Sequence, residues 1–244
     1  MNRRLYSLKK RLLCLLLFSF LLPSIVSSAI LQSRVSASTD DAEEFANGGM
    51  SISSSDLELA FDTNPGLQTV GIRFTDLAIP ENATITQAYI QFKVDETSSD
   101  NVLLTIYGED ADNAPTFSST AYNISSRTGT IASVSWAPPA WNSIGAEGEE
   151  QQTSDLTSIV QEIVSRPGWS SGNAMAFIIT GTENAKRVAE SYNGDQTGAP
   201  LLYVEYETIP DTTVPVITSS AAVNVPENTT AVVTLTATDA STPV

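Results

Sequence analysis

The segment Ile85-Thr-Gln-Ala-Tyr-Ile-Gln-Phe-Lys-Val94 decides the fold class. Apolar side chains occupy every second position from Ala88 to Val94, and polar side chains lie between them at Gln87, Gln91 and Lys93. Tyr89 is the exception, because it places an aromatic ring on the polar side. A period of two is typical of a β-strand with one face in the core and the other in water.

Six further segments show short runs of this kind, and clusters of Gly, Pro, Asn, Asp and Ser separate them: 57–61, 70–74, 102–107, 131–136, 175–180 and 201–206. Seven such strands indicate an all-β fold, a jelly-roll-like β-sandwich. The segment 156–164 has helical spacing instead, with Thr153-Ser-Asp155 before it and Pro167-Gly168 after it. We predict one short amphipathic helix that packs on the sandwich and shields an exposed strand edge.

Residues 1–29 predict a secretory signal peptide. Five basic residues precede an apolar run from Leu12 to Leu22, which is too short to span a bilayer. A signal peptidase requires small residues at positions −3 and −1 before the cleaved bond. Cleavage after Ala29 or after Ser38 meets this requirement. We therefore expect a secreted or cell-surface protein with no transmembrane segment in the mature chain.

Composition argues against several functions. The only cysteine, Cys14, lies in the predicted leader, and the sequence contains no histidine. The usual general base, thiol nucleophile and transition-metal ligands are therefore missing together. Beyond residue 29, seven basic residues stand against 28 acidic ones, a net charge of −21. This charge argues against nucleic acid as a partner, and we expect no enzymatic activity.

The chain divides after residue 206. Residues 40–206 are predicted to form the sandwich, and residues 207–215, with two prolines and no periodicity, a linker. Residues 216–244 contain one strand-like run and are too few to close a core of their own. We expect an incomplete immunoglobulin-like module, loosely ordered or leaning on the sandwich.

The segment Val70–Ile90, VGIRFTDLAIPENATITQAYI, resembles the opening of the DNRLRE, or disaggregatase-related, β-sandwich family of bacterial and archaeal surface proteins. The predicted helix and the closing segment 199–206 also match that family's layout, so the resemblance covers residues 40–206. Members are similar to jelly-roll carbohydrate-binding modules, and some are attached to polysaccharide-degrading enzymes. The resemblance implies a polysaccharide as partner.

The tail resembles a truncated cadherin-like repeat through Val225-Pro-Glu-Asn228 and Ala237-Thr-Asp239. In cadherins such acidic residues hold calcium between modules, which implies metal-binding roles for Glu227 and Asp239, with Asp211 in the linker as a third ligand. The later acidic motif is missing, and three carboxylates do not fill a shell of about six to eight oxygens. The resemblance implies adhesion to another cell-surface protein, with calcium as cofactor.

Aromatic rings are natural platforms for sugars, since a flat ring covers the apolar face of a pyranose. Trp136 and Trp141 flank a proline-rich loop, and Trp141 is the first candidate; a place in the core is the alternative. Arg187, Glu190 and Tyr192 lie close together before a turn and could bind sugar hydroxyls. An edge ion pair between the first two is the alternative interpretation.

Two acidic clusters inside the predicted sandwich are calcium candidates. The first contains Asp40 and Asp41 with Glu43 and Glu44, and the second spans 109–113. Solvated loop acids are the alternative interpretation. The sequence thus predicts a non-catalytic binding or adhesion protein that uses calcium, with a carbohydrate-binding module and a secreted glycoside-acting enzyme with paired carboxylates as alternatives.

Overall fold

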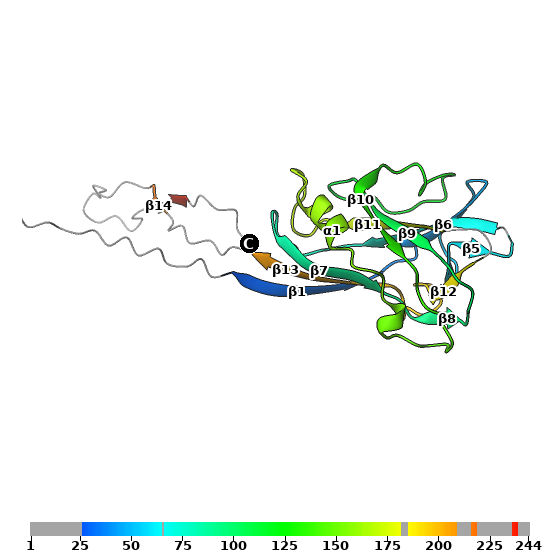
Figure 1. Ribbon diagram of the computed structural model, residues 1–244. Coiled ribbons are helices and arrows are strands. Elements are labelled where there is room, and N and C mark those ends of the chain that lie inside the picture. The colour runs from blue at the N-terminus through cyan, green and yellow to red at the C-terminus, as the bar shows by residue number, and fades with distance from the viewer. Residues whose placement is uncertain (1–25, 65, 182–184, 209–215, 219–235, 239–244) are drawn as a thin grey trace, which may run out of the picture.

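The computed structural model describes residues 26–64, 66–181, 185–208, 216–218 and 236–238 (Figure 1). Its helices are α1 (Thr157–Val164) and the 3-10 helix η1 (Glu149–Gln151). Its strands are β1 (Ser27–Arg34), β2 (Asp41–Phe45), β3 (Met50–Ser51), β4 (Asp56–Leu59), β5 (Phe61–Asp62), β6 (Gly66–Phe74), β7 (Thr84–Gln91), β8 (Val94–Glu96), β9 (Leu104–Glu109), β10 (Gly129–Trp136), β11 (Met175–Gly181), β12 (Arg187–Glu190), β13 (Leu201–Thr208), β14 (Val216–Ile217) and β15 (Ala237–Thr238).

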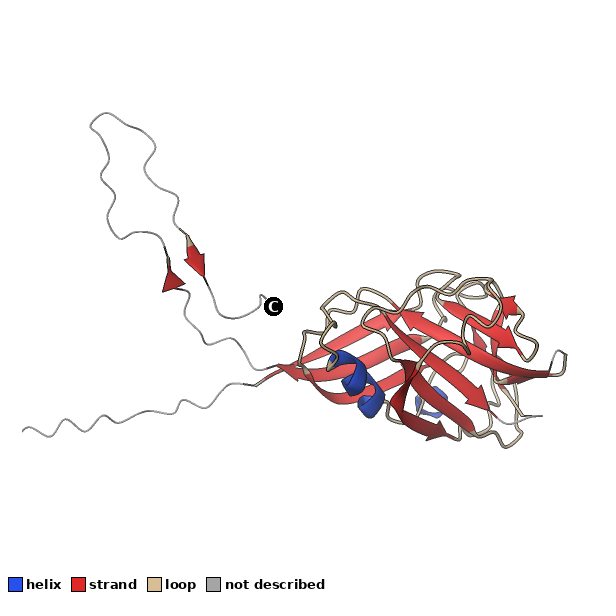
Figure 2. Ribbon diagram, turned by 90° about the horizontal axis from the view of Figure 1, so that it is seen from above, coloured by secondary structure: helices blue, strands red, loops and turns tan. Residues whose placement is uncertain are grey.

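The strands of the first domain form a sandwich around one main core (Figure 2). One layer is a seven-stranded sheet in the order β10-β9-β11-β6-β2-β3, with β5 paired to β6. Facing it are the three-stranded sheets β1-β13-β7 and β4-β12-β8, which are linked where β7 passes into β8. Neighbouring strands run antiparallel. The fold is therefore an all-β sandwich with one short helix, as the sequence predicts.

The segment that decided the fold class lies at the centre of the core. Ala88, Ile90, Phe92 and Val94 are all fully buried, and they belong to the same apolar cluster as the inner residues of the seven-stranded sheet. The alternation within 85–94 is therefore the direct cause of the two-layer packing.

Helix α1 closes one side of the sandwich. Its apolar stripe, formed by Ile159, Val160, Ile163 and Val164, is buried in the main core. The carboxylate of Asp155 accepts a hydrogen bond from the backbone amide of Thr157 and stabilises the first turn. The helix begins at Thr157, one residue later than the predicted apolar run.

Two neighbouring side chains of the helix bond to strand edges in different layers. Gln161 accepts a hydrogen bond from the amide of Ile85 in β7 (2.9 Å). Glu162 accepts bonds from the amides of Ile131 and Ala132 in β10 (2.8 Å each). The helix therefore satisfies backbone amides of two edge strands that could otherwise pair with a strand of another molecule. This confirms the predicted shielding role.

The outer face of the seven-stranded sheet is covered by the loop between β9 and β10. Phe117 and Ile124 from this loop pack against the sheet, and a Cβ at Gly71 would lie only 2.5 Å from the ring of Phe117. Arg127 stacks over the same ring at 4.2 Å and pairs with Glu109 at 2.6 Å. On the opposite layer, Gln32, Tyr89 and Tyr203 are exposed or partly exposed in neighbouring strands, so the outer face of β1-β13-β7 is open.

Several predictions fall outside the described residues. They concern most of the signal peptide, the linker and most of the cadherin-like tail, including the candidate ligands Asp211, Glu227 and Asp239. In the tail, β14 and β15 pair antiparallel. Strand β1 begins at Ser27, two residues before the end of the predicted leader. Among the described residues, no helix has the length and apolar character needed to cross a membrane.

Candidate functional site

The structure places the predicted sugar-binding tryptophans in the core. Trp141 is 0% exposed and Trp136 is 3% exposed. The ring of Trp136 stacks on Phe92, with centroids 5.5 Å apart, and the indole nitrogen of Trp141 donates to the carbonyl of Glu150. Neither ring offers a face to a ligand, because core side chains already cover both. The sugar platform expected at these two residues is corrected to a packing role.

Arg187, which was expected to bind sugar hydroxyls at the surface, has a structural role instead. The side chain is 1% exposed, and its guanidinium donates to the carbonyls of Pro138, Pro139 and Lys186 at 2.8 to 3.0 Å. Desolvation lowers the pKa of Arg187, and the nearby charge of Asp100 opposes that shift. Arg187 therefore anchors the proline-rich loop that leads to the buried indole of Trp141.

The three polar candidates before the turn do not form one surface group. Tyr192 packs against the core, and Arg187 is buried, while Glu190 lies partly exposed at the end of β12. Burial, followed by the charge of Asp95, raises the pKa of Glu190. Within the described residues, Arg187 makes no ion pair with Glu190, so the alternative edge pair is not formed either.

The acids predicted as a first calcium site are internal hydrogen-bond partners. Asp40 pairs with Arg73 at 2.6 Å, and Asp41 accepts a bond from the amide of Tyr192 at 2.7 Å. Each carboxylate is thus used by a partner on a different element, Arg73 in β6 and the amide that follows β12. The calcium site expected at Asp40 and Asp41 is corrected to two separate structural contacts.

The second acidic cluster, at 109–113, is also neutralised within the protein. Glu109 pairs with Arg127, and Asp110 and Asp112 both pair with Arg166. Arginine occupies the space in which a cation would have to bind. The calcium site expected at 109–113 is therefore corrected to a set of ion pairs with two arginines.

Two buried acids of β2 predict an unusual pH dependence. Burial raises the pKa of Asp41 to about 7 and that of Glu43 to about 9. Their ordinary values lie near 4, so the unfolded chain ionises first as pH rises. Their contribution to the free energy of unfolding is therefore fully present below about pH 4. It is lost as pH rises through their folded-state pKa values.

We expect Glu43→Gln to flatten this dependence, since glutamine does not titrate yet keeps an acceptor for the amide of Glu58, which Glu43 binds at 2.9 Å. Thermal unfolding between about pH 5 and about pH 9 should show a smaller fall in Tm for this variant than for the wild type. Glu149→Gln, at an exposed acid, is the control. Equal falls in all three proteins would contradict the assignment.

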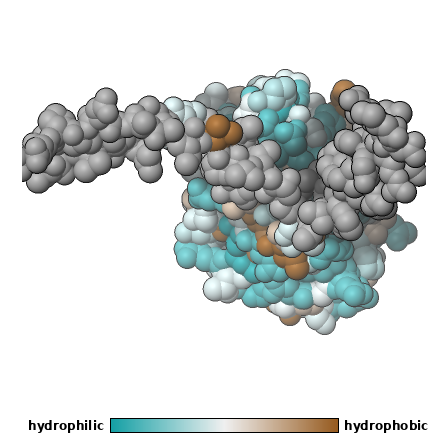
Figure 3. Space-filling model, turned by 90° about the vertical axis from the view of Figure 1, so that its left-hand side faces the viewer, coloured by the Kyte–Doolittle hydropathy of each residue, from teal (hydrophilic) through white to brown (hydrophobic). Residues whose placement is uncertain are grey.

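The open face of β1-β13-β7 carries an aromatic pair. Tyr89 of β7 and Tyr203 of β13 stand directly opposite each other in the strand register, and their rings stack with centroids 4.7 Å apart and planes 11° apart. Gln32 of β1 is the next residue across the sheet. In the view toward the end of this sheet, the described surface is mainly hydrophilic with small hydrophobic patches (Figure 3). The aromatic pair has polar neighbours on the same sheet, since Gln32 lies beside Tyr203, and Gln87 and Glu205 form the next pair on that face.

A depression of about 390 Å³ lies beside Tyr89. Its lining residues come from β7, from β13 and from the segment before α1: Thr86, Gln87, Ala88, Tyr89, Gln152, Thr153, Asp155 and Glu205. The segment before α1 is held by hydrogen bonds, because Thr153 accepts from the amide of Ile90 and Leu156 donates to the carbonyl of Ala88. One wall of the depression is thus aromatic, and most of the remainder is polar.

Both phenols of the pair stay neutral over the physiological range. The hydroxyl of Tyr203 donates to Glu205, and this bond, with burial and the charge of Glu205, raises the pKa of Tyr203 to about 12. Burial and the charge of Glu205 also raise the pKa of Tyr89. The sequence marked Tyr89 as the exception in its strand, and that exception was the available cue to this face.

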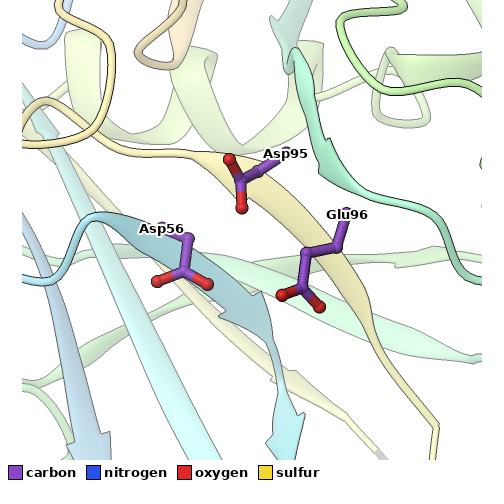
Figure 4. A group of neighbouring side chains, drawn as sticks. All are labelled: Asp56, Asp95 and Glu96. Carbon is purple, nitrogen blue, oxygen red and sulfur yellow. The ribbon is translucent and has the colours of Figure 1, made fainter.

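Asp56, Asp95 and Glu96 form an acidic cluster that could hold a metal ion (Figure 4). One oxygen from each carboxylate lies within 4.8 Å of the others. Asp56 begins β4 and the other two lie in β8, on either side of β12. Burial, followed by the charges of Asp56 and Glu96, raises the pKa of Asp95. The sequence could not show this cluster, because β12 brings together strands far apart in the chain.

No model of a known protein family matches the chain, and no curated protein matches it. Its class is therefore defined by the structure: an all-β sandwich with one covered sheet face and one open face that carries stacked tyrosines beside a polar depression.

Proposed function

We propose that this protein is a secreted or cell-surface, non-catalytic binding protein that holds a polysaccharide on the open face of β1-β13-β7. The observation that supports this most is the stacked pair Tyr89 and Tyr203 beside the depression. Aromatic rings can cover the apolar face of a sugar, and nearby amide and carboxylate groups can bind its hydroxyls. The sequence resemblance of residues 40–206 to the disaggregatase-related family, whose members are similar to jelly-roll carbohydrate-binding modules, favours the same proposal.

The proposed location rests on the predicted leader and on the sequence beyond residue 29, which is strongly acidic and contains no cysteine. Adhesion to another cell-surface protein remains the main alternative role and rests on the cadherin-like tail. A glycoside-acting enzyme is the second alternative, because Asp155 and Glu205 line the same depression and hydrolysis requires two facing carboxylates. Release of reducing sugar from a bound polysaccharide would reveal such an enzyme.

We expect the isolated domain to bind on a glycan array, and Tyr89→Ala and Tyr203→Ala each to weaken that binding about tenfold. Tyr122→Ala is the matched control, since Tyr122 is an exposed aromatic residue outside this face. Circular dichroism should show that all three variants are folded. Binding that survives the loss of both face tyrosines, or no binding to any glycan, would refute the proposal.

We further propose that calcium is the ion held by Asp56, Asp95 and Glu96. Lys186 faces Glu96 at 3.8 Å, but Asp56 and Asp95 form no ion pair among the described residues. A divalent cation would relieve the remaining repulsion, and carboxylate oxygens are ligands that Ca²⁺ prefers. Saturating calcium should raise Tm by about 5 to 10 °C, and Asp95→Asn should abolish most of this increase. Glu149→Gln should respond like the wild type. A Tm that does not change with calcium would refute calcium binding at this cluster.

A further inference from the structure

The basic residues of the sandwich are all occupied by partners within the protein. Beyond residue 29 the chain contains seven lysines and arginines, and the structure describes every one. Six form ion pairs with acidic side chains, and the seventh, Arg187, donates to three backbone carbonyls. The ion pairs are Arg34–Glu147, Arg73–Asp40, Lys93–Asp195, Arg127–Glu109, Arg166 with Asp110 and Asp112, and Lys186 with Asp62 and Glu96.

The open tyrosine face has a charge of the opposite sign. Asp155 and Glu205 line the depression, and none of its lining residues is basic. Arg34 is the basic residue on this side of β1, two positions beyond Gln32, but its guanidinium donates to the carbonyl of Ala199 and faces Glu147 at 3.6 Å. Lys93, which lies on the same polar side of its segment as Tyr89, is paired with Asp195 at 2.6 Å. An anionic ligand would therefore meet carboxylates on this face, and both nearby basic residues already have acidic partners.

Stacked tyrosines next to carboxylates suit a positively charged ligand. A ring face attracts a cation through its quadrupole, and a carboxylate pairs with an ammonium group directly. Glu205 combines the two effects, because it accepts a hydrogen bond from the hydroxyl of Tyr203 and also lines the depression beside Tyr89. One oxygen of Glu205 is used by that phenol, which leaves the second for a ligand.

We propose that the polysaccharide bound by this face carries free amino groups, and that uronate-bearing polymers are rejected. This inference rests on the proposed glycan-binding function and specifies the chemical class of its ligand. An ammonium group lies near Glu205 and Asp155, while the apolar face of the same or the neighbouring sugar ring contacts Tyr89. Electrostatic attraction by the acidic sandwich raises the local concentration of such a polymer, and the tyrosine face provides the site.

Four hexamers with the same β-1,4 backbone test this proposal: glucosamine, N-acetylglucosamine, glucose and glucuronate. Binding is measured by calorimetry at physiological ionic strength and about pH 5, which lies below the pKa of a glucosamine amino group and above that of a uronate carboxyl. We expect the glucosamine hexamer to bind about fivefold to tenfold more tightly than the two neutral hexamers. The glucuronate hexamer should bind most weakly.

Glu205→Gln separates site-specific pairing from general attraction, because glutamine keeps an acceptor for Tyr203 and removes the charge. This variant should lose most of the preference for glucosamine, measured as the ratio of its affinities for the glucosamine and glucose hexamers. Glu81→Gln, at an exposed acid that does not line the depression, is the matched control and should behave like the wild type.

The experiment separates selection for amino sugars from polysaccharide binding on the tyrosine face. Equal or tighter binding of the glucuronate hexamer, or a glucosamine preference that Glu205→Gln leaves intact, would overturn the charge selection alone. Binding of every hexamer that Tyr89→Ala leaves unchanged would overturn the tyrosine face as the site. No binding of any hexamer would overturn both.

Discussion

Trp141→Ala is expected to lower the free energy of unfolding by about 3 to 5 kcal/mol, because truncation of a fully buried aromatic side chain leaves a large cavity. The indole contacts Phe92 and Trp136, with ring centroids 6.4 Å away in each case, and it donates to the carbonyl of Glu150. The variant should therefore lose stability throughout the region where the proline-rich loop meets the core. Urea denaturation measures the change.

The control is Ile131→Ala, since Ile131 is 97% exposed and should change stability by no more than about 0.5 kcal/mol. The comparison also decides between the two interpretations of Trp141. A variant of normal stability that has lost glycan binding would identify Trp141 as a surface platform, contrary to the structure. A destabilised variant that still binds while folded would support the core assignment.

Arg187→Ala is expected to cost about 3 to 5 kcal/mol, because it removes a buried side chain and leaves the carbonyls of Pro138 and Pro139 without their donor. Arg187→Lys should recover only part of this loss, since one ammonium group cannot reproduce the planar fork that reaches three carbonyls. The change is measured by urea denaturation of the full chain.

Glu190→Gln is the informative partner variant. If Arg187 acts through the loop carbonyls, this substitution should leave stability within about 0.5 kcal/mol of the wild type. The double variant should then equal the sum of the two single ones. A large loss for Glu190→Gln, together with a double variant no worse than Arg187→Ala, would instead demonstrate an Arg187–Glu190 ion pair.

The strands and the helix could largely be predicted from the sequence, because alternation and helical spacing record burial directly. The segments 175–180 and 201–206 correspond to β11 and β13, and the run 156–164 corresponds to α1. Strand β2 was missed, since Asp41, Glu43 and Glu44 are buried acids whose hydrogen-bond partners lie far away in the chain. Strand β1 was missed because its sequence also fits the end of a leader.

The candidate site was harder to predict than the fold. Tryptophan is a common sugar platform, which favours Trp136 and Trp141, but local sequence does not show that both rings lie in the core. Tyr89 and Tyr203 are 114 positions apart and become neighbours only through the β7–β13 register. The alternation does place Tyr89 on the solvent side of its strand, but it does not show that Tyr203 lies beside it.

The proposed function requires that ligand contacts the tyrosine face and leaves the core tryptophans untouched. Two-dimensional NMR of protein labelled in its tyrosine and tryptophan rings tests this claim most directly, with the glucosamine hexamer as the titrant. We predict that the ring signals of Tyr89 and Tyr203 shift in a saturable manner while the indole signals of Trp136 and Trp141 remain unchanged. Shifts of the indole signals, with the signals of both face tyrosines unmoved, would contradict the account.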